Sequence, residues 1–422
     1  MAFSVDDVAW LASHPDAVAA ASGLSFSAAD AVRDTATLRD AYGDRARVLA
    51  ELVTARRRGK VPADWLVCSD SAQQATPAAV AAVRARHLAA VAPGAVVFDA
   101  TCSVGTELAH LADPTWGFGL VAGGDLDPAR LAMAHHNLPE VPLVRADATR
   151  PAVRADVVVA DPARRTARGR IRDPKDLIPP LPDLLAAWRG VRAPGAGMSG
   201  TAGTVGTAVK CAPGIDYSEW EGQVDVVSLA GSSGAGGGVK EACLYSPGLS
   251  LVGRRAVVVG EDRTVELTSA DPESDAVAPV GRYILDPDGA VVRAGLVTQY
   301  AAALGWWRVD PHIAYLSGDT VPEPADMVPG QRVFEVVDTV PLKKLKAALV
   351  SATAGPSTAG TGGRGATSLE ILVRGADVDP DALRKKMRPV LARGGGGALT
   401  VVIARIGRSP VAVVTRQVHP RG

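Results

Sequence analysis

Short apolar runs alternate with helix-like segments through the middle of the chain. Between the runs, segments such as PARLAMAHHN repeat their apolar residues at helical spacing, and 177–188 does the same. Strands that are separated by helices are typical of a mostly parallel, doubly wound α/β sheet. The predicted strands are AVVFDA, GLVAGGD, VPLVRAD, ADVVVAD and TVGTAVK, followed by the closing pair QVDVVSLAG and VKEACLYS.

Helical patterns also fill the first 68 residues. Ser4 and Asp7 have the spacing of a capping box, and Val5, Val8 and Leu11 recur on one helical face. Further along, Thr76 before a proline has the position of a helix cap. We therefore expect an N-terminal helical region in front of the α/β sheet.

The C-terminal part predicts a second, smaller domain. QRVFEVVD and SLEILVRG have the pattern of strands, LKKLKAAL and DPDALRKKM that of helices, and ALTVVIARIG and PVAVVTRQV that of a final strand pair. This order indicates a small α+β domain. We expect a helix within 286–305, a hairpin loop at 231–238 and a mobile low-complexity loop at 351–367. The predicted segments are 1–68 (helical region), 69–246 (α/β domain), 247–330 (connecting region) and 331–422 (α+β domain).

Charge is distributed unevenly along a chain that has no net charge. Residues 330–422 hold 15 Lys and Arg against 6 Asp and Glu, a surplus of 9 positive charges, so the remainder is acidic. Such asymmetry favours a polyanionic partner, although a solvated basic surface has the same composition.

Composition also limits where the protein works. The four cysteines have no metal-binding or redox spacing, and so few thiols fit a reducing compartment. The acidic N-terminus is unlike a secretory signal, and no apolar run reaches the length of about 18 residues that a membrane helix needs. We expect a cytoplasmic protein with neither a membrane segment nor a metal site.

Acidic residues stand at the ends of four successive predicted strands. Asp99 precedes a turn that contains Gly105, and Asp125 with Asp127 follows the next strand about 20 residues later. An acid at that distance can accept hydrogen bonds from ribose hydroxyls, and Asp147 can accept an adenine amino proton. The turn has one glycine instead of G-x-G-x-x-G, which disfavours a pyrophosphate. A ligand with adenine and ribose but no phosphate, S-adenosylmethionine, therefore fits best.

At these residues the chain resembles the class I S-adenosylmethionine-dependent methyltransferases. VVFDATCSVGTELAHLA is similar to their first motif, GGDLDP to the ribose-binding strand, RADAT to the adenine-binding strand, and SDSAQQATP to a segment that closes over the cofactor. The resemblance covers residues 69–246 and implies a Rossmann-like sheet. It implies that the cofactor is held by Thr76, Asp99, Thr101, Cys102, Gly105, Asp125, Asp127, Asp147 and Ala148.

The rest of the chain resembles a narrower group, bacterial methyltransferases that carry a C-terminal THUMP-like domain. The similar stretches are AVKCAPGIDY, YILDPDGAVVRAGLV, RVDPHIAYLSGD and SLEILVRGADVDPDALRKKM. By analogy, this resemblance implies an RNA substrate, tRNA or rRNA. The cations that we expect to contact RNA in the C-terminal domain include Lys344, Lys385 and Lys386.

Asp161 ends the fourth strand, and arginines follow it. In the methyltransferase interpretation, Asp161, Pro162 and Arg164 form the catalytic segment, in which the acid orients or deprotonates an attacking nitrogen. Guanidinium groups suit phosphates, so the loop arginines are candidates for RNA contact; ion pairs with nearby aspartates are the alternative. The loop arginines beyond Arg164 are Arg165, Arg168 and Arg170.

The sequence leaves the methylated atom open. D-P-A-R lacks the aromatic residue of amino-methylating motifs, but it is similar to the RNA uracil-5-methyltransferases, which need a nucleophilic cysteine. Cys211 is the candidate, yet its context VKCAPG differs from theirs, which favours a structural residue. Lys210 either lines the pocket or ends a solvated strand.

Three functions remain in competition. The first is an RNA methyltransferase, the second a small-molecule methyltransferase with a structural tail, and the third a non-catalytic RNA-binding protein. The basic tail favours the first function over the second, and the four strand-end acids favour it over the third.

Overall fold

The computed structural model describes residues 3–163, 165–166, 169–170, 173–189, 206–231, 237–354, 366–391 and 397–418. The chain forms two compact units. The first comprises Met1–Asp225 and Lys240–Gly253, and the second Val226–Val239 and Arg254–Gly422. The two predicted loops, at 231–238 and 351–367, fall mostly outside the described residues. The division into four segments stays a prediction.

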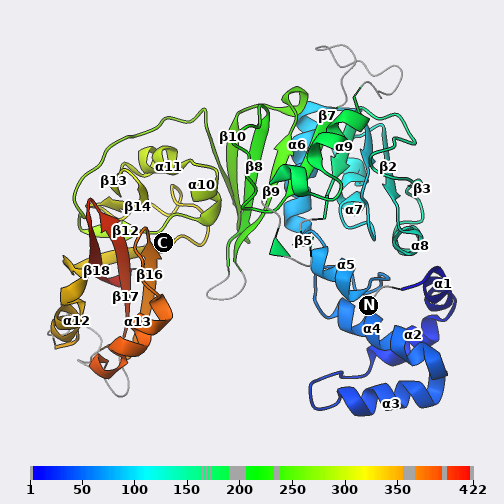
Figure 1. Cartoon of the computed structure of the whole chain (residues 1–422), viewed down its shortest axis with the longest axis horizontal. Coiled ribbons are helices and arrows are strands. Elements are labelled where there is room, and N and C mark those ends of the chain that lie inside the picture. Colours follow the sequence, from blue (N-terminus) through cyan, green and yellow to red (C-terminus); the bar gives the residue numbers. More distant parts are fainter. Residues whose placement is uncertain are drawn as a thin grey trace. The chain divides into compact units, whose positions relative to one another are not determined.

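The N-terminal region is helical, as predicted (Figure 1, blue). The capping box is present, because the Ser4 hydroxyl accepts the Asp7 amide at 3.1 Å and the Asp7 carboxylate accepts the Ser4 amide at 3.0 Å. The buried Leu11, Leu49 and Leu52 form the centre of a core that these helices share. The helices are α1 (Val5–Ser13), α2 (Pro15–Ser22), α3 (Ala31–Tyr42), α4 (Ala46–Arg56) and α5 (Ser69–Gln74).

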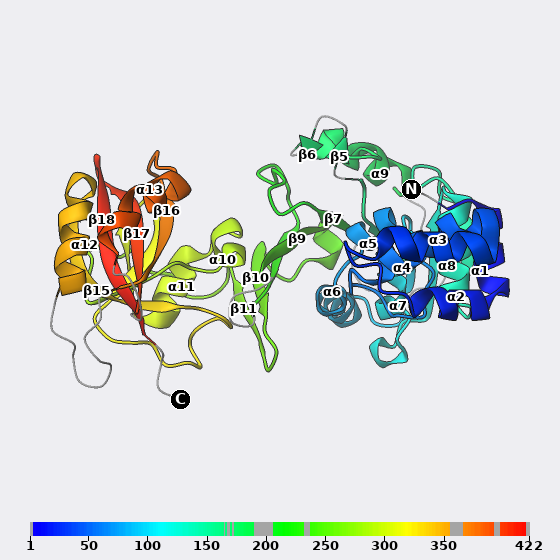
Figure 2. The same cartoon turned by 90° about the horizontal axis from the view of Figure 1, so that it is seen from below.

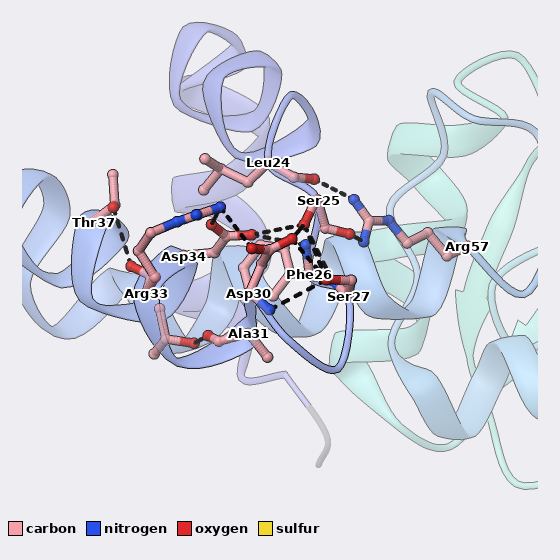
Figure 3. A network of polar contacts seen from close by, with 11 residues as sticks. Leu24, Ser25, Phe26, Ser27, Asp30, Ala31, Arg33, Asp34, Thr37 and Arg57 are labelled. Carbon is pink, nitrogen blue, oxygen red and sulfur yellow. Dashed lines mark hydrogen bonds and ion pairs between the residues drawn. The ribbon is translucent and has the colours of Figure 1, made fainter.

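A buried carboxylate holds the connection between α2 and α3. Asp34, only 2% exposed, accepts the Phe26 amide at 2.8 Å, and Phe26 has a positive φ of 43°. The Arg57 guanidinium donates to the carbonyl groups of Leu24 and Ser25, so the same connection is held from α4 (Figure 3). Arg57, directly after α4, thus serves a structural purpose there.

The sheet of the first unit is mostly parallel, as the alternating pattern predicted. Its described strands follow the order β9-β7-β4-β1-β2-β3, and β9 alone runs antiparallel to its neighbour β7. β8 (Gln223–Leu229) begins in the first unit and ends in the second. The bounds are β1 (Val96–Asp99), β2 (Leu120–Asp125), β3 (Leu143–Arg145), β4 (Val157–Ala160), β7 (Gly206–Cys211) and β9 (Gly238–Tyr245).

Helices cover both faces of this sheet. Leu88 of α6 (Ala78–Val91) and Leu111 of α7 (Leu108–Leu111) pack with Val97 of β1, whereas the adjacent Phe98 faces the other side and contacts Trp188 beyond α9 (Leu181–Ala187). Successive residues of a strand point to opposite faces, so β1 is buried on both.

The N-terminal helices are anchored to the α/β sheet through α8 (Pro128–Asn137). The Asn137 side chain donates to the carbonyl groups of Leu66 and Val104, each at 3.0 Å, and accepts the Leu66 amide at 2.8 Å. One side chain thus joins the helical region to the turn that follows β1.

The second unit contains a strand pair and a seven-stranded sheet. The pair is antiparallel, β10 (Arg254–Val259) with β11 (Thr264–Thr268). The sheet has the order β13-β14-β12-β15-β18-β17-β16 and is antiparallel except for β16 with β17. Its strands are β12 (Tyr283–Leu285), β13 (Trp307–Asp310), β14 (Ile313–Gly318), β15 (Val333–Pro341), β16 (Ser368–Arg374), β17 (Ala398–Ile406) and β18 (Ser409–Val418).

Strands from both sides of residue 330 belong to this sheet. β12, β13 and β14 therefore make the predicted connecting region part of the same structure as the basic C-terminal segment. The single helix expected within 286–305 is two helices, α10 (Gly289–Arg293) and α11 (Val297–Leu304). The break between them falls at Gly295, which has a φ of 67°. Glycine adopts this left-handed conformation easily, and helices often end at such a residue.

Two helices cover one face of the seven-stranded sheet (Figure 2). Leu345 and Leu349 of α12 (Leu345–Ala354) and Met387 of α13 (Pro380–Met387) are buried against Val401 and Val414. The predicted small α+β domain is thus present. Across the described residues of both units, no helix has the length and apolar character needed to cross a membrane.

We predict that Asp34→Ala loosens the connection between α2 and α3. The Phe26 amide would lose its acceptor in a buried place, at a cost of about 1–2 kcal/mol. Amide hydrogen exchange in 24–34, read by mass spectrometry, should become on the order of tenfold faster. Asp40→Ala removes an exposed acid from the same helix and should leave the exchange rate unchanged. Equal exchange rates in the two variants would contradict this role of Asp34.

Candidate active site

A cavity of about 310 Å³ lies at the carboxyl ends of the parallel strands in the first unit. The ends of β1, β2, β4 and β7 contribute to it, and so do the segments after α5 and β3. Parallel strands bring their carboxyl ends to one edge of a sheet, which is where ligands bind in such folds. The predicted site residues that line it are Thr76, Asp99, Thr101, Cys102, Asp125, Asp147, Ala148, Asp161 and Lys210.

The turn after β1 is shaped by two residues with positive φ. Ser103 has a φ of 51° and Gly105 a φ of 94°, and a Cβ atom at Gly105 would lie 2.7 Å from the Leu138 side chain. A side chain at position 105 would therefore be strained by the backbone conformation and crowded by Leu138. Asp99 stabilises the start of the turn, because its carboxylate accepts the Thr101 amide at 3.0 Å.

Asp125 connects this turn to the end of β2. Its carboxylate accepts the Ser103 amide at 3.0 Å and the Asp127 amide at 2.9 Å, and the residue is 7% exposed. Asp127 itself caps α8 by accepting the amides of Ala129 and Arg130. The side chain of Asp127 is engaged in this cap, and a ligand contact by Asp127 stays a prediction.

The segment after β3 brings a further acid to the cavity. Asp147 accepts both the amide and the hydroxyl of Thr149, at 2.8 and 2.7 Å, and these two hydrogen bonds lower the pKa of Asp147. The neighbouring Ala148 carbonyl accepts the Trp188 indole N–H at 2.9 Å. Both residues are therefore fixed by contacts within the first unit.

A buried lysine joins the end of β4 to the segment before α6. Lys210 is only 3% exposed. Its ammonium nitrogen lies 2.6 Å from an Asp161 carboxylate oxygen and 2.7 Å from the Thr76 hydroxyl oxygen. The Asp161 amide in turn donates to the Thr101 hydroxyl at 2.6 Å. Thr76 was expected to cap α6, but Pro77 occupies that position and the Thr76 hydroxyl accepts a hydrogen bond from Lys210. Lys210 is consequently a buried residue of the cavity, not a solvated strand end.

Sequence reasoning missed a second charged group at the same cavity. Arg84 of α6 is 1% exposed and forms ion pairs with Glu107 and with Glu241 of β9. Burial lowers the pKa of Arg84, but the carboxylates of Glu107 and Glu241 raise it by more, so it lies well above its usual range. Burial raises the pKa of Glu241. Arg84 and Glu107 line the cavity. The sequence did contain a signal for a buried cation: Arg84 stands four residues from both Val80 and Leu88, on the apolar face of the helix.

The cavity is acidic. Burial raises the pKa of Asp99 well above its usual range, and the carboxylates of Glu107, Asp161 and Asp125 raise it further. This arrangement disfavours phosphate groups and suits a ligand with hydroxyl, amino or cationic groups. In the described part of the chain, no cluster of His, Cys, Asp and Glu is arranged to hold a metal ion.

The arginine-rich segment leaves the cavity and returns to it. Ala163 and Ile178 both line the cavity and pair with each other, the Ala163 amide donating to the Ile178 carbonyl at 2.7 Å. Of the backbone between them, the structure describes residues 173–177 and an antiparallel pair of two-residue strands, β5 (Arg165–Thr166) and β6 (Gly169–Arg170) (Figure 2). Arg164 and Arg168 lie outside the described residues. Pro162, directly after Asp161, is buried.

All four cysteines are buried thiols. Cys211 follows Lys210 in β7 and therefore points to the opposite face of the sheet from the cavity. Cys102 lines the cavity, but burial together with Asp99 and Asp125 raises the pKa of its thiol. Burial likewise raises the pKa of Cys243 to about 12. Burial thus disfavours the thiolate form of Cys102 and Cys243, and Cys211 points to the other face of the sheet from Lys210.

The predicted cations of the C-terminal segment lie in the second unit. Lys344, directly before α12, and Lys385 and Lys386 on α13 are exposed, and none of the three forms an ion pair with another described residue. Because α12 and α13 cover the same face of the sheet, these cations belong to one helical layer.

Known proteins resemble both parts of the chain. Residues 331–417 match the THUMP domain-like family. An uncharacterized S-adenosylmethionine-dependent methyltransferase of Mycobacterium tuberculosis, in strains CDC 1551 and H37Rv, is 41% identical over 404 residues, which is 90% of this chain and 99% of the relative. The crystal structure of a proposed methyltransferase from Porphyromonas gingivalis W83 has a TM-score of 0.64 at 18% identity, and covers 99% of this chain and 100% of its own. That structure shares the fold.

We predict that the thiols of the native protein react slowly. With a pKa of about 12, Cys243 is ionised at pH 8 only to a fraction on the order of 10⁻⁴. Iodoacetamide at pH 8, followed by mass spectrometry, should label Cys102 and Cys243 only after unfolding in urea. Rapid labelling of Cys102 in the native protein would contradict the buried, neutral state of its thiol.

Proposed function

This chain belongs to the S-adenosylmethionine-dependent methyltransferases, and we propose that it methylates a base in RNA. The observation that carries the RNA substrate is the exposed layer of cations on α12 and α13, in the segment that matches the THUMP domain-like family. Phosphate contacts from such cations supply sequence-independent affinity for nucleic acid.

The cofactor site that we propose is the acidic cavity of the first unit. Asp125 and Asp147, fixed by backbone hydrogen bonds after adjacent strands, would accept hydrogen bonds from the ribose and the adenine. Asp99, Thr101, Cys102, Gly105 and Ala148 would shape the turn and the walls around them. When bound, S-adenosylmethionine supplies an electrophilic methyl group.

Asp161 is the residue that we propose for handling the acceptor. It follows β4, lines the cavity and is fixed from two sides, by Lys210 at its carboxylate and by Thr101 at its amide. A carboxylate so fixed can orient an N–H group of the acceptor and take its proton. Pro162 restricts the backbone that follows.

The segment between Ala163 and Ile178 is the proposed entry for the substrate. It carries Arg164, Arg165, Arg168 and Arg170, and both of its ends lie at the cavity. Guanidinium groups bind phosphate oxygens and stack on bases. We propose that these arginines place the target nucleotide beside Asp161.

Replacing Asp161 tests the chemistry. Asp161→Ala should reduce transfer of the labelled methyl group from S-adenosylmethionine to total bacterial RNA at least on the order of 100-fold, because the acceptor loses its orienting carboxylate. S-adenosylhomocysteine affinity, measured by calorimetry, should stay within a few-fold. Asp113→Ala changes an exposed helix cap of the same unit and serves as the control. Label that enters only small molecules would refute the RNA substrate, and full activity of Asp161→Ala would remove Asp161 from the reaction.

The helical layer of cations yields a separate prediction. Replacing Lys344, Lys385 and Lys386 together by glutamine should weaken RNA binding on the order of tenfold or more. The slope of the logarithm of the binding constant against the logarithm of the salt concentration should become less steep by about one for each lost phosphate contact. S-adenosylhomocysteine affinity should not change. Arg39→Gln, an exposed cation of α3, is the control for charge alone. RNA affinity that is unchanged in the triple variant would assign RNA contact to another surface.

A further inference from the structure

We propose that Glu107 accepts hydrogen bonds from the ammonium group of the cofactor's methionine moiety. This inference rests on the cofactor site proposed above, but it does not depend on RNA as the substrate. It assigns a role to a carboxylate that neither the strand-end pattern nor the proposed chemistry uses.

The position of Glu107 points to a ligand. It follows the turn after β1 directly, precedes α7 and lines the cavity together with Thr106. The residue is only 7% exposed. Within the described chain, neither of its carboxylate oxygens accepts a hydrogen bond. One oxygen lies 2.7 Å from a terminal nitrogen of Arg84, close enough for an ion pair but without hydrogen-bond alignment.

A buried carboxylate without hydrogen bonds is costly. Desolvation disfavours such a group unless donors compensate it, and one ion pair leaves most of its lone pairs unused. A ligand ammonium, which has three N–H donors, would supply the missing hydrogen bonds. Because Glu107 lines the cavity, these donors can come from a bound molecule.

The surrounding charges also favour a cation. Arg84 pairs with both Glu107 and Glu241, whereas Lys210 pairs with Asp161. Because Arg84 is shared with Glu241, a ligand ammonium would give Glu107 a cationic partner of its own.

The order of the strands separates the two ends of the site. Asp125 ends β2 and Asp147 follows β3, whereas Arg84, the partner of Glu107, lies on α6 and pairs with Glu241 of β9, the neighbour of β7. At about 4.8 Å per strand, β7 and β2 are roughly 14 Å apart across β4 and β1. An extended ligand with its nucleoside at β2 and β3 would direct its other end toward the charged cluster.

Ligand binding by Glu107→Gln tests the proposal. S-adenosylhomocysteine has the amino acid moiety, and 5′-methylthioadenosine lacks it. Calorimetry should show a loss on the order of 10- to 100-fold in affinity for the first ligand and a change below about twofold for the second. Equal losses for both ligands, or no loss for S-adenosylhomocysteine, would overturn the proposal.

Glu241→Gln is the matched control. Glu241 also pairs with Arg84 but is not among the residues that line the cavity. A loss specific to S-adenosylhomocysteine in this variant would trace the effect to Arg84 and overturn the role of Glu107.

A ligand series covers the case in which Glu107→Gln does not fold. The wild-type protein should then bind an S-adenosylhomocysteine analogue without the amino group on the order of 10- to 100-fold more weakly than the parent compound. Equal affinity would overturn the proposal. None of these measurements involves RNA, so failure of the RNA assignment and failure of this inference give different results.

Discussion

The site depends on the requirement that a buried ammonium group must be paired. Lys210 is 3% exposed, and its two acceptors come from residues far away in the sequence, Thr76 and Asp161. Satisfying the charge of Lys210 therefore draws the segment before α6 and the end of β4 to the same place. Removing either acceptor would leave a buried charge poorly compensated, which is more costly than losing a surface contact.

The same requirement organises the neighbouring network. Arg84 can be buried on the sheet-facing side of α6 because Glu107 and Glu241 neutralise it. These groups bring together a helix, the turn after β1 and the strand β9. The polar part of the cavity is thus held by long-range charge pairs, and the wall at β2 and β3 by local hydrogen bonds of Asp125 and Asp147 to backbone amides.

These two kinds of contact explain what the sequence could and could not predict. The strand-end acids were predictable, because parallel strands place their carboxyl ends at one edge and each acid follows an apolar run. Arg84 and Glu107 were not predicted, since their pairing depends on tertiary contacts that no local spacing encodes. Thr76 illustrates the difference: its place beside the cavity followed from the sequence, whereas its partner Lys210, 134 residues away, did not.

The second unit was predicted in outline for a similar reason. The strands and helices after residue 330 have clear local patterns, but the pairing of β12 with β15 joins segments on either side of that position. The apolar residues within 286–305 recur at helical spacing and predict one helix. The helix is interrupted at Gly295 by a backbone conformation that cannot be inferred from this spacing. The sequence thus predicted which segments are helices and strands better than it predicted which strands pair and where a helix is interrupted.

Charge of opposite sign at the cavity of the first unit and on the helices of the second would separate the binding of the two proposed ligands. Carboxylates outnumber cations around the cavity, which disfavours polyphosphate ligands and agrees with the cofactor that we propose there. The cations of α12 and α13 are exposed instead, where solvent and salt screen them and where they can exchange counterions for phosphates. Under the proposed function, the buried acidic cavity would hold the cofactor, and the exposed basic layer would attract the polyanionic substrate. Binding of the first should depend little on salt, and binding of the second strongly.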